Sequence, residues 1–325
     1  MEKIHIISSL EMGGAEKYLS ELLSNNRKKS EHIFVIKNKI HPIIKTKCEK
    51  TNIIINSIFS LLFLKHIFKR STVYCWMYHA ILIGVLFFPK RTICMVRQSG
   101  FSKKDKKLTK FIVYHILPSL VKRSLGIVYV SNESRKTHFD YGWYNLKNTI
   151  IENGYVFKNG KFPQHIHNIS FIGRNHPIKR FDLFYDLSSA LNGNFILQVF
   201  GNGYDNYLNS NIRVEGICPE NIIYEKTDLV LVLSDDEGFS NVLREAIANN
   251  CFVLSTDCGG AGDILISDYI INQDIYDIKE KINNLNLNLK QHSYNFNKIK
   301  KTLVAKNSIS NKYDELIKFT SLCVE

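Results

Sequence analysis

The sequence lacks the features that would place it outside the cell or across a membrane. Its 7 cysteines are scattered, with no C-x-x-C pair, which favours reduced thiols over a disulfide framework or a zinc site. No basic stretch followed by an apolar one opens the chain, so we expect no signal peptide. The run nearest to transmembrane length, residues 53–64, has only 12 residues and is interrupted by Asn56, Ser57 and Ser60. We therefore expect a cytoplasmic protein that does not span the membrane.

Acidic residues are scarce in the first half of the chain. Residues 1–155 hold 26 Lys and Arg against 10 Asp and Glu, or +16, and the rest of the chain holds 17 against 20, or −3. Such a basic half faces a polyanion, either a nucleic acid or an anionic membrane. A hydrophobic content of 45% over 325 residues excludes a disordered chain and allows two domains.

Short β-branched runs alternate with longer helical patterns in both halves. The runs are continuously apolar, as in "DLVLVLS" (228–234) and "CFVLSTD" (251–257), which is typical of parallel strands covered on both faces. Residues 268–272, "DYIIN", are expected as the last strand, and 155–167 as the linker. The alternation predicts two facing, doubly wound α/β domains with a cleft at the carboxyl ends of their strands.

The segment "DDEGFSNVLREA" (235–246) places two glutamates around the start of one helix. Ser240 or Asn241 can cap this helix, whose first N–H groups suit a phosphate. Glu245 follows about one turn later, roughly 6–8 Å along the axis, where a carboxylate suits a ribose. Glu237 in the loop suits a second polyol. A capped helix with two solvated glutamates explains the same residues equally well.

Two further loops carry ligand-binding patterns. In "FIGRNHPIKRFD" (171–182), Gly173 ends a strand, and Arg174 and Lys179 can neutralise a departing diphosphate, although surface cations on a basic protein look the same. In "SSLEMGGAEKYL" (8–19), Gly13 and Gly14 permit close approach of the backbone to a ligand.

Together these motifs resemble glycosyltransferase family 4, the retaining nucleotide-sugar glycosyltransferases of GT-B fold. The segment from Glu237 to Glu245 is similar to the family's Glu-x7-Glu motif, and residues 171–179 to its G-R-x4-K loop. "IIENGYVF" (150–157), "VFGNGYDNYL" (199–208) and "WMYHA" (76–80) also look familial. Arg244 departs from the family, which often has an apolar residue there.

The resemblance implies a role for each matching residue. Glu245 would hold the ribose hydroxyls and Glu237 the donor hexose. Arg174 and Lys179 would bind the diphosphate, and His79 would contact the transferred sugar or the acceptor unless it is structural. The remaining donor-binding positions would be Gly13, Gly14, Gly173, Gly238, Phe239, Ser240, Asn241 and Val242. The nucleotide sugar would be a substrate, and no cofactor or metal is expected.

The resemblance also implies the domains and the acceptor. Residues 1–155 would bind the acceptor, 156–310 the nucleotide sugar, and 311–325 would form a helix packing back on the first domain. Because that domain is basic, we expect peripheral binding to the inner, anionic face of the cell membrane through 60–70 and 101–123, unless these are core helices. The acceptor would be a lipid-linked or lipopolysaccharide glycan of a bacterial surface polysaccharide.

The sequence is also compatible with two other functions. One is a nucleotide-sugar 2-epimerase of GT-B fold, which would change the sugar without an acceptor. The other is a non-catalytic nucleic-acid binder, motivated by charge alone. The sequence contains no recognised nucleic-acid-binding motif, so we expect no nucleic-acid partner.

Overall fold

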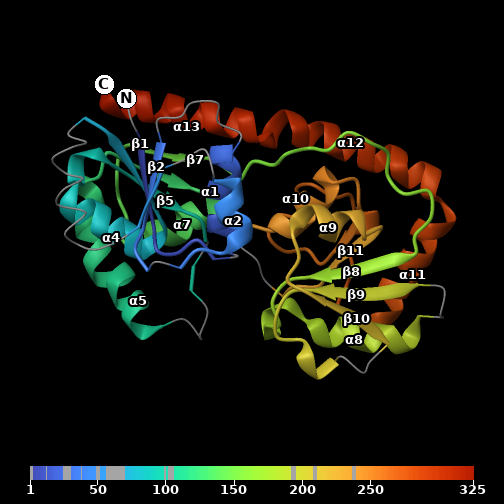
Figure 1. Cartoon of the computed structure of the whole chain (residues 1–325). Coiled ribbons are helices and arrows are strands. Elements are labelled where there is room, and N and C mark those ends of the chain that lie inside the picture. The colour runs from blue at the N-terminus through green and yellow to red at the C-terminus, as the bar shows by residue number, and fades with distance from the viewer. Residues whose placement is uncertain are drawn as a thin grey trace. The chain divides into compact units, whose positions relative to one another are not determined.

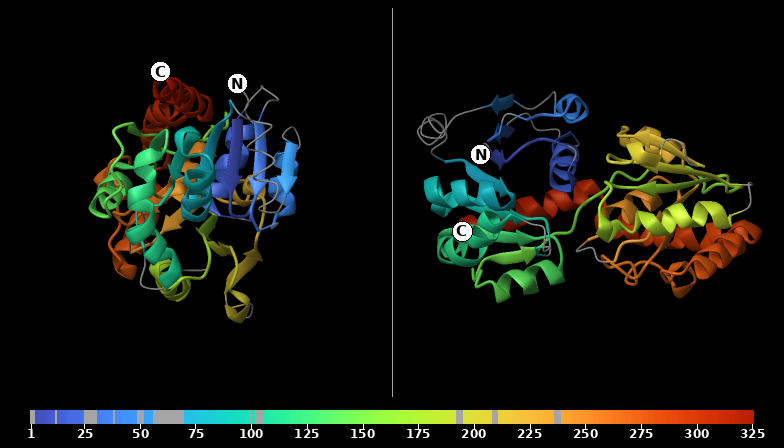
Figure 2. Two further views of the ribbon diagram at one scale, coloured as in Figure 1. Left: turned by 90° about the vertical axis from the view of Figure 1, so that its left-hand side faces the viewer. Right: turned by 90° about the horizontal axis from the view of Figure 1, so that it is seen from below.

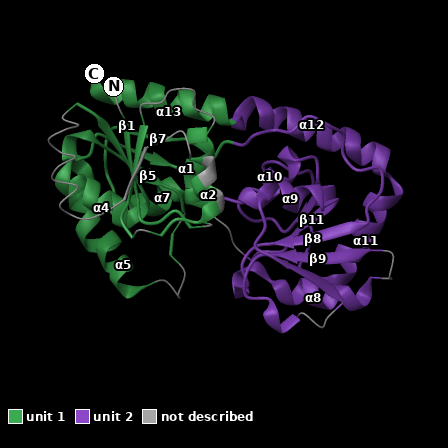
Figure 3. Ribbon diagram, in the orientation of Figure 1, with its two compact units in different colours: residues 1–154, 309–325 green, residues 155–308 purple. Residues whose placement is uncertain are grey.

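The computed structural model describes residues 3–11, 13–24, 31–37, 39–48, 52–55, 70–98, 100–101, 106–191, 195–207, 211–235 and 239–325. The chain forms two compact units, coloured separately in Figure 3. Unit 1 comprises residues 1–154 and 309–325, and unit 2 comprises residues 155–308. The division therefore falls one or two residues before each expected domain boundary.

Unit 1 is built on a parallel sheet with the strand order β3-β2-β1-β4-β5-β6-β7. The chain moves outward from β1 in one direction and then, from β4, in the other, so right-handed crossovers place helices on both faces. Figures 1 and 2 show these helices on either side of the strands. The elements are β1 (Lys3–Ile7), α1 (Gly14–Ser24), β2 (Glu31–Val35), α2 (Pro42–Lys47), β3 (Asn52–Ile55), β4 (Thr72–Trp76), α4 (Met77–Phe87), η1 (Pro89–Arg91), β5 (Thr92–Val96), α5 (Lys107–Phe111), the π-helical η2 (Ile112–Ile116), α6 (Leu117–Leu120), η3 (Val121–Arg123), β6 (Gly126–Tyr129), α7 (Asn132–Asp140), β7 (Asn148–Ile150) and α13 (Ile309–Val324).

Strand β4 shows why these apolar runs are continuous. All five of its residues are buried. Val73 and Cys75 pack in one hydrophobic cluster with α4, whereas Tyr74 and Trp76 pack in the other cluster with α1 and α13. A strand buried on both faces favours apolar side chains along its length. The parallel pairing of β4 with β1 and β5 confirms the sheet type expected from the sequence.

The C-terminal helix α13 packs on unit 1, as expected. Its residues Ile309, Leu316 and Cys323 are buried in the same cluster as α1. Tyr313 Oη donates a hydrogen bond to Glu31, the first residue of β2, whose carboxylate also lies 3.1 Å from the Nζ of Lys3. Hydrophobic contact and the hydrogen bond from Tyr313 to Glu31 therefore hold the end of the chain on this unit.

Unit 2 contains a second parallel sheet with the strand order β10-β9-β8-β11-β12. Helices α8 and α11 contact each other, and α10 contacts β11, β12 and α12. In Figure 1, α9 and α10 lie on the opposite side of the strands from α8. The elements are β8 (Asn168–Ile172), η4 (Pro177–Lys179), α8 (Phe181–Ala190), β9 (Ile196–Phe200), η5 (Asp205–Tyr207), β10 (Ile212–Gly216), α9 (Glu220–Glu225), β11 (Leu229–Val232), α10 (Asn241–Ala248), β12 (Phe252–Ser255), η6 (Ser267–Tyr269), α11 (Ile275–Leu287) and α12 (Leu289–Asn307).

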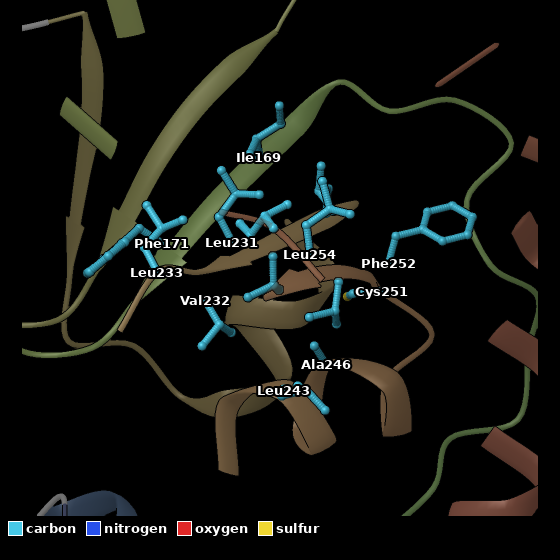
Figure 4. Packing of buried hydrophobic residues seen from close by; sticks show 14 of the residues in the cluster. Ile169, Phe171, Leu231, Val232, Leu233, Leu243, Ala246, Cys251, Phe252 and Leu254 are labelled. Carbon is cyan, nitrogen blue, oxygen red and sulfur yellow. The ribbon is translucent and has the colours of Figure 1, made fainter. Parts of the chain in front are cut away.

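Helix α10 is fixed by its apolar side. Leu243 and Ala246 are fully buried and belong to the cluster that contains Val232 of β11 and Leu254 of β12. Figure 4 shows these side chains gathered between the helix and the strands. Burying a leucine of this kind contributes about 1.5–3 kcal/mol. The packing sets which residues of α10 face away from the core.

One sequence-based assignment in unit 2 is wrong. Residues 268–272 do not form a sheet strand, because Ser267–Tyr269 is a 3-10 turn and only a single bridge joins Ile270 to Ser255. The expected linker forms neither helix nor strand over residues 156–167, and its Phe162 and Ile166 are buried in the core of unit 2.

The structure describes only part of the two segments expected at the membrane. Residues 60–69 lie outside the described residues. In the second segment, Ile112, Val113, Leu117 and Val121 are buried in the core of unit 1. Across the described ranges, we find no helix with the length and apolar character needed to cross a bilayer.

Candidate functional site

The carboxyl edge of the unit 2 sheet carries most of the candidate residues. Strand β8 pairs with β11, and β11 pairs with β12, all in parallel. The loops that follow these three strands therefore leave from one edge and lie beside one another. This is the edge at which open α/β sheets bind ligands.

The loop after β8 holds the two candidate cations. Gly173 has a φ of 154°, which favours glycine, and its carbonyl accepts a hydrogen bond from Tyr204 Oη at 3.1 Å. A Cβ placed on Gly173 would lie 3.9 Å from Cε of Lys179, so the lysine stem runs beside the glycine. Lys179 is half-buried and Arg174 is exposed. The structure thus places both cations on one loop at the carboxyl edge.

Asp235 joins this loop to the loop after β11. Its N–H donates to the carbonyl of Ile178 at 2.8 Å. Its Oδ1 accepts from Arg180 Nη1 at 3.2 Å and from Gln273 Nε2 at 2.8 Å. Asp235 thus links the loop that carries Arg174 and Lys179 to the segment that leads into α10. Within the described chain, no group of three His, Cys, Asp or Glu side chains is arranged to hold a metal ion.

Two candidate residues, Glu237 and Gly238, lie outside the described residues. The contacts expected for Glu237 with a donor sugar stay a prediction.

The start of α10 differs from the expected capped helix. Ser240 occupies the N-cap position but makes no side-chain cap bond, and its buried Oγ has no hydrogen-bond partner among the described residues. Asn241 is already the first helical residue, and its Oδ1 accepts from Tyr155 Oη at 2.8 Å. The expected capping by Ser240 or Asn241 is therefore wrong. Phe239 and Val242, on either side, are half-buried.

Glu245 lies one turn into α10 and is mostly buried, with 9% of its surface exposed. Tyr224 Oη, from α9, donates to Glu245 Oε2 at 2.9 Å. Burial, with the nearby charge of Glu245, raises the pKa of Tyr224 well above its usual value, so the phenol stays a proton donor. Tyr224 therefore orients one carboxylate oxygen of Glu245.

The remaining candidates lie at the carboxyl edge of the unit 1 sheet. Gly13 follows β1, and Gly14 is the first residue of α1. His79 is exposed in the first turn of α4. Partial burial and the positive charges of Lys37 and Lys106 lower the pKa of His79, which favours a neutral imidazole.

Sequence reasoning missed several residues of this site. Tyr224, Arg180 and Tyr155 each act on a residue at least 21 positions away in the chain. Tyr224 lies in no quoted motif, and although Arg180 and Tyr155 lie within residues 171–182 and 150–157, nothing local indicates that they contact Asp235 and Asn241. Only the strand order brings them together.

Comparisons with known proteins agree with this architecture. Residues 166–288 match the family described as Glycosyl transferases group 1. Anabaena Alr3699/HepE in complex with UDP and glucose superimposes with a TM-score of 0.81 at 15% identity over 99% of both chains. No curated protein sequence matches the chain.

Two other solved structures show the same fold. The lipopolysaccharide outer core galactosyltransferase WaaB has a TM-score of 0.66 at 15% identity, covering 98% of this chain and 99% of its own. A glycosyltransferase from Rickettsia africae has a TM-score of 0.72 at 15% identity, covering 100% of this chain and 99% of its own.

These findings define the class of the protein. The two Rossmann-like units have the architecture of GT-B glycosyltransferases. The family match spans β8 to α11, which includes Arg174, Lys179 and Glu245. The chain is an enzyme of the glycosyltransferase class with the GT-B fold.

Proposed function

We propose that the chain is a retaining glycosyltransferase of family 4. It moves a hexose or N-acetylhexosamine from a nucleotide diphosphate sugar to a hydroxyl of a membrane-borne glycan in lipopolysaccharide, O-antigen or capsule synthesis. UDP is the proposed nucleotide, supported by the Anabaena structure, which holds UDP and glucose. WaaB, by its description, acts on the lipopolysaccharide outer core, which supports a similar acceptor.

The observation that carries the donor assignment is the meeting of two motif loops at Asp235. Arg174 and Lys179 lie on the loop that Asp235 anchors, and Glu245 lies just beyond the loop that Asp235 begins. A diphosphate between the cations and the start of α10 would leave the nucleoside within reach of Glu245. The sugar would then extend toward Glu237.

The proposed reaction proceeds on one face of the sugar. The bond between the anomeric carbon and the phosphate oxygen breaks, and the acceptor oxygen bonds to that carbon on the same side. The acceptor proton passes to the leaving phosphate. Arg174, Lys179 and the first N–H groups of α10 stabilise the charge that develops on the diphosphate, and the proposed mechanism requires no metal.

A transfer assay tests the proposal. Purified protein is incubated with UDP-, GDP- and ADP-sugars, each with and without an acceptor extract from membranes. We expect sugar to appear on the acceptor with one donor class and with retained anomeric configuration. Sugar conversion without acceptor would instead indicate the epimerase.

The proposed membrane contact lies on α5. Leu108 and Phe111 are 69% and 54% exposed, although both are large apolar residues. They are three positions apart and so share a helix face, beside Lys107 and Lys110. Apolar side chains flanked by lysines suit the interface of an anionic bilayer.

Vesicle sedimentation tests this contact. The wild-type chain should bind vesicles of anionic phospholipid at low salt and release them at high salt. Replacing both Leu108 and Phe111 by Ser should weaken binding about tenfold or more, because about 0.8 kcal/mol is lost per exposed methylene that no longer inserts. Leu287→Ser, at an 82% exposed position of unit 2, is the control and should bind normally. Equal binding by all three proteins would contradict the assignment.

A further inference from the structure

Arg244 is a buried cation in the middle of the helix that carries Glu245. Only 5% of its surface is exposed. Its Nη1 donates to the carbonyl of Ser240 at 3.0 Å and to the carbonyl of Gly259 at 3.2 Å. Its guanidinium lies over the ring of Phe239, 3.8 Å from the centroid. One side chain therefore contacts both residues before α10 and the loop after β12.

The two loops are also joined directly. The N–H of Ser240 donates to the carbonyl of Gly259 at 3.2 Å. That carbonyl thus accepts two hydrogen bonds, one from the backbone and one from Arg244. The neighbouring Gly260 has a φ of 74°, and a Cβ there would come within 3.3 Å of Arg244 Nη2. The Gly259–Gly260 turn is shaped to leave room for the guanidinium.

Filling the core does not require an arginine at this position. Transferring a guanidinium out of water is costly, and an apolar side chain of similar volume would pack as well or better. The planar guanidinium can donate to two carbonyls and stack on a ring at the same time, which a lysine cannot reproduce. The arginine therefore provides geometry rather than volume.

We infer that Arg244 is a positioning residue for phosphate recognition, on the basis of the proposed function. It holds Phe239 and Ser240 in place, and so orients the N–H groups at the start of α10 toward the donor diphosphate. It lies too deep to touch the donor itself. The nucleoside is held separately, by Glu245 with Tyr224, whose hydrogen bond does not involve Arg244.

Because the phosphates and the nucleoside are held by different groups, loss of Arg244 should weaken binding of the phosphates only. In Arg244→Met, affinity for UDP should fall about tenfold or more, since the oriented N–H groups are lost. Affinity for uridine, which has no phosphate, should stay within about twofold of the wild type. The affinity of Arg244→Lys for UDP should lie between those of the wild type and Arg244→Met, because lysine keeps the charge but not the planar geometry. Ligand-observed NMR and calorimetry give both dissociation constants.

Leu243→Ala is the control for a general weakening of α10. Leu243 is fully buried in the core and contributes no hydrogen bond to either loop. This variant should melt earlier but keep the wild-type ratio of UDP to uridine affinity. Equal losses for UDP and uridine in Arg244→Met, or no loss for either, would overturn the inference. Failure of the wild type to bind any nucleoside diphosphate would instead overturn the proposed function, and this inference with it.

Discussion

Protonation of His138 should destabilise unit 1. This side chain is fully buried at the end of α7. Its Nδ1 lies 2.7 Å from the carbonyl of Ser134, which can only accept, so Nδ1 carries the proton. Its Nε2 then accepts a hydrogen bond from Tyr78 Oη at 2.8 Å. A second proton on Nε2 would make Tyr78 Oη the acceptor of this bond and would place a positive charge in the core, which is costly because the ring is buried.

The size of the effect follows from the pKa. Burial lowers the pKa of His138 from 6.5 to about 4. The folded-state pKa lies below the unfolded value, so this contribution to stability is complete above the unfolded pKa and is lost as the pH falls toward the folded pKa. At about 1.4 kcal/mol per pKa unit, the total is roughly 3 kcal/mol, of which roughly 2 kcal/mol is lost by about pH 5.

Urea unfolding followed by tryptophan fluorescence measures this loss. The chain has 2 tryptophans, and both belong to unit 1, so the signal reports that unit. His138→Gln keeps a donor and an acceptor but cannot titrate, and its free energy of unfolding should fall less between neutral pH and about pH 5. The same pH dependence in both proteins, or a His138 ring that titrates near its ordinary pKa by NMR, would refute the reasoning.

Three further outcomes are expected. Tyr224→Phe removes the hydroxyl that donates to Glu245, so calorimetry should show about tenfold weaker nucleotide binding, and unchanged binding would contradict the orienting role. Arg174→Met and Lys179→Met should each lower kcat about a hundredfold, whereas Arg213→Met, an exposed cation on β10, should not; equal effects would point to net charge alone. A chelator should leave turnover within about twofold, and a loss restored by Mg²⁺ would show that a metal is needed.

Hydrophobic patterning allows much of the fold to be predicted. Strands such as β4, β11 and β12 are short and buried on both faces, so their continuous apolar runs stand out in the sequence. The pattern fails where such a run lies outside the sheet. "DYIIN" looks like a strand because Tyr269, Ile270 and Ile271 form an apolar run, but Tyr269 lies in a 3-10 turn and only a single bridge joins Ile270 to Ser255.

The candidate site could be predicted only where its chemistry lies in a local motif. The sequence places Arg174 and Lys179 after one strand and Glu245 in the helix that follows another, and the parallel sheet brings the ends of both strands to one edge. The interactions that orient these loops, such as Arg180 with Asp235, join residues 55 positions apart and depend on strand order. Ser240 was expected to act as a cap from its residue type, but its buried hydroxyl makes no cap bond.

The most direct test is thermal stabilisation of the chain by nucleotide sugars. At a donor concentration about a hundred times Kd, binding adds about 2.7 kcal/mol, which raises Tm by roughly 5–10 °C. Glu245→Gln keeps an acceptor for Tyr224 but loses the charge, and Glu225→Ala removes a carboxylate on α9 that is 65% exposed. We predict that one class of UDP-, GDP- or ADP-sugar stabilises the wild type and Glu225→Ala but not Glu245→Gln or Glu245→Ala. Undiminished stabilisation of both Glu245 variants would contradict the assignment of this edge as the nucleotide site.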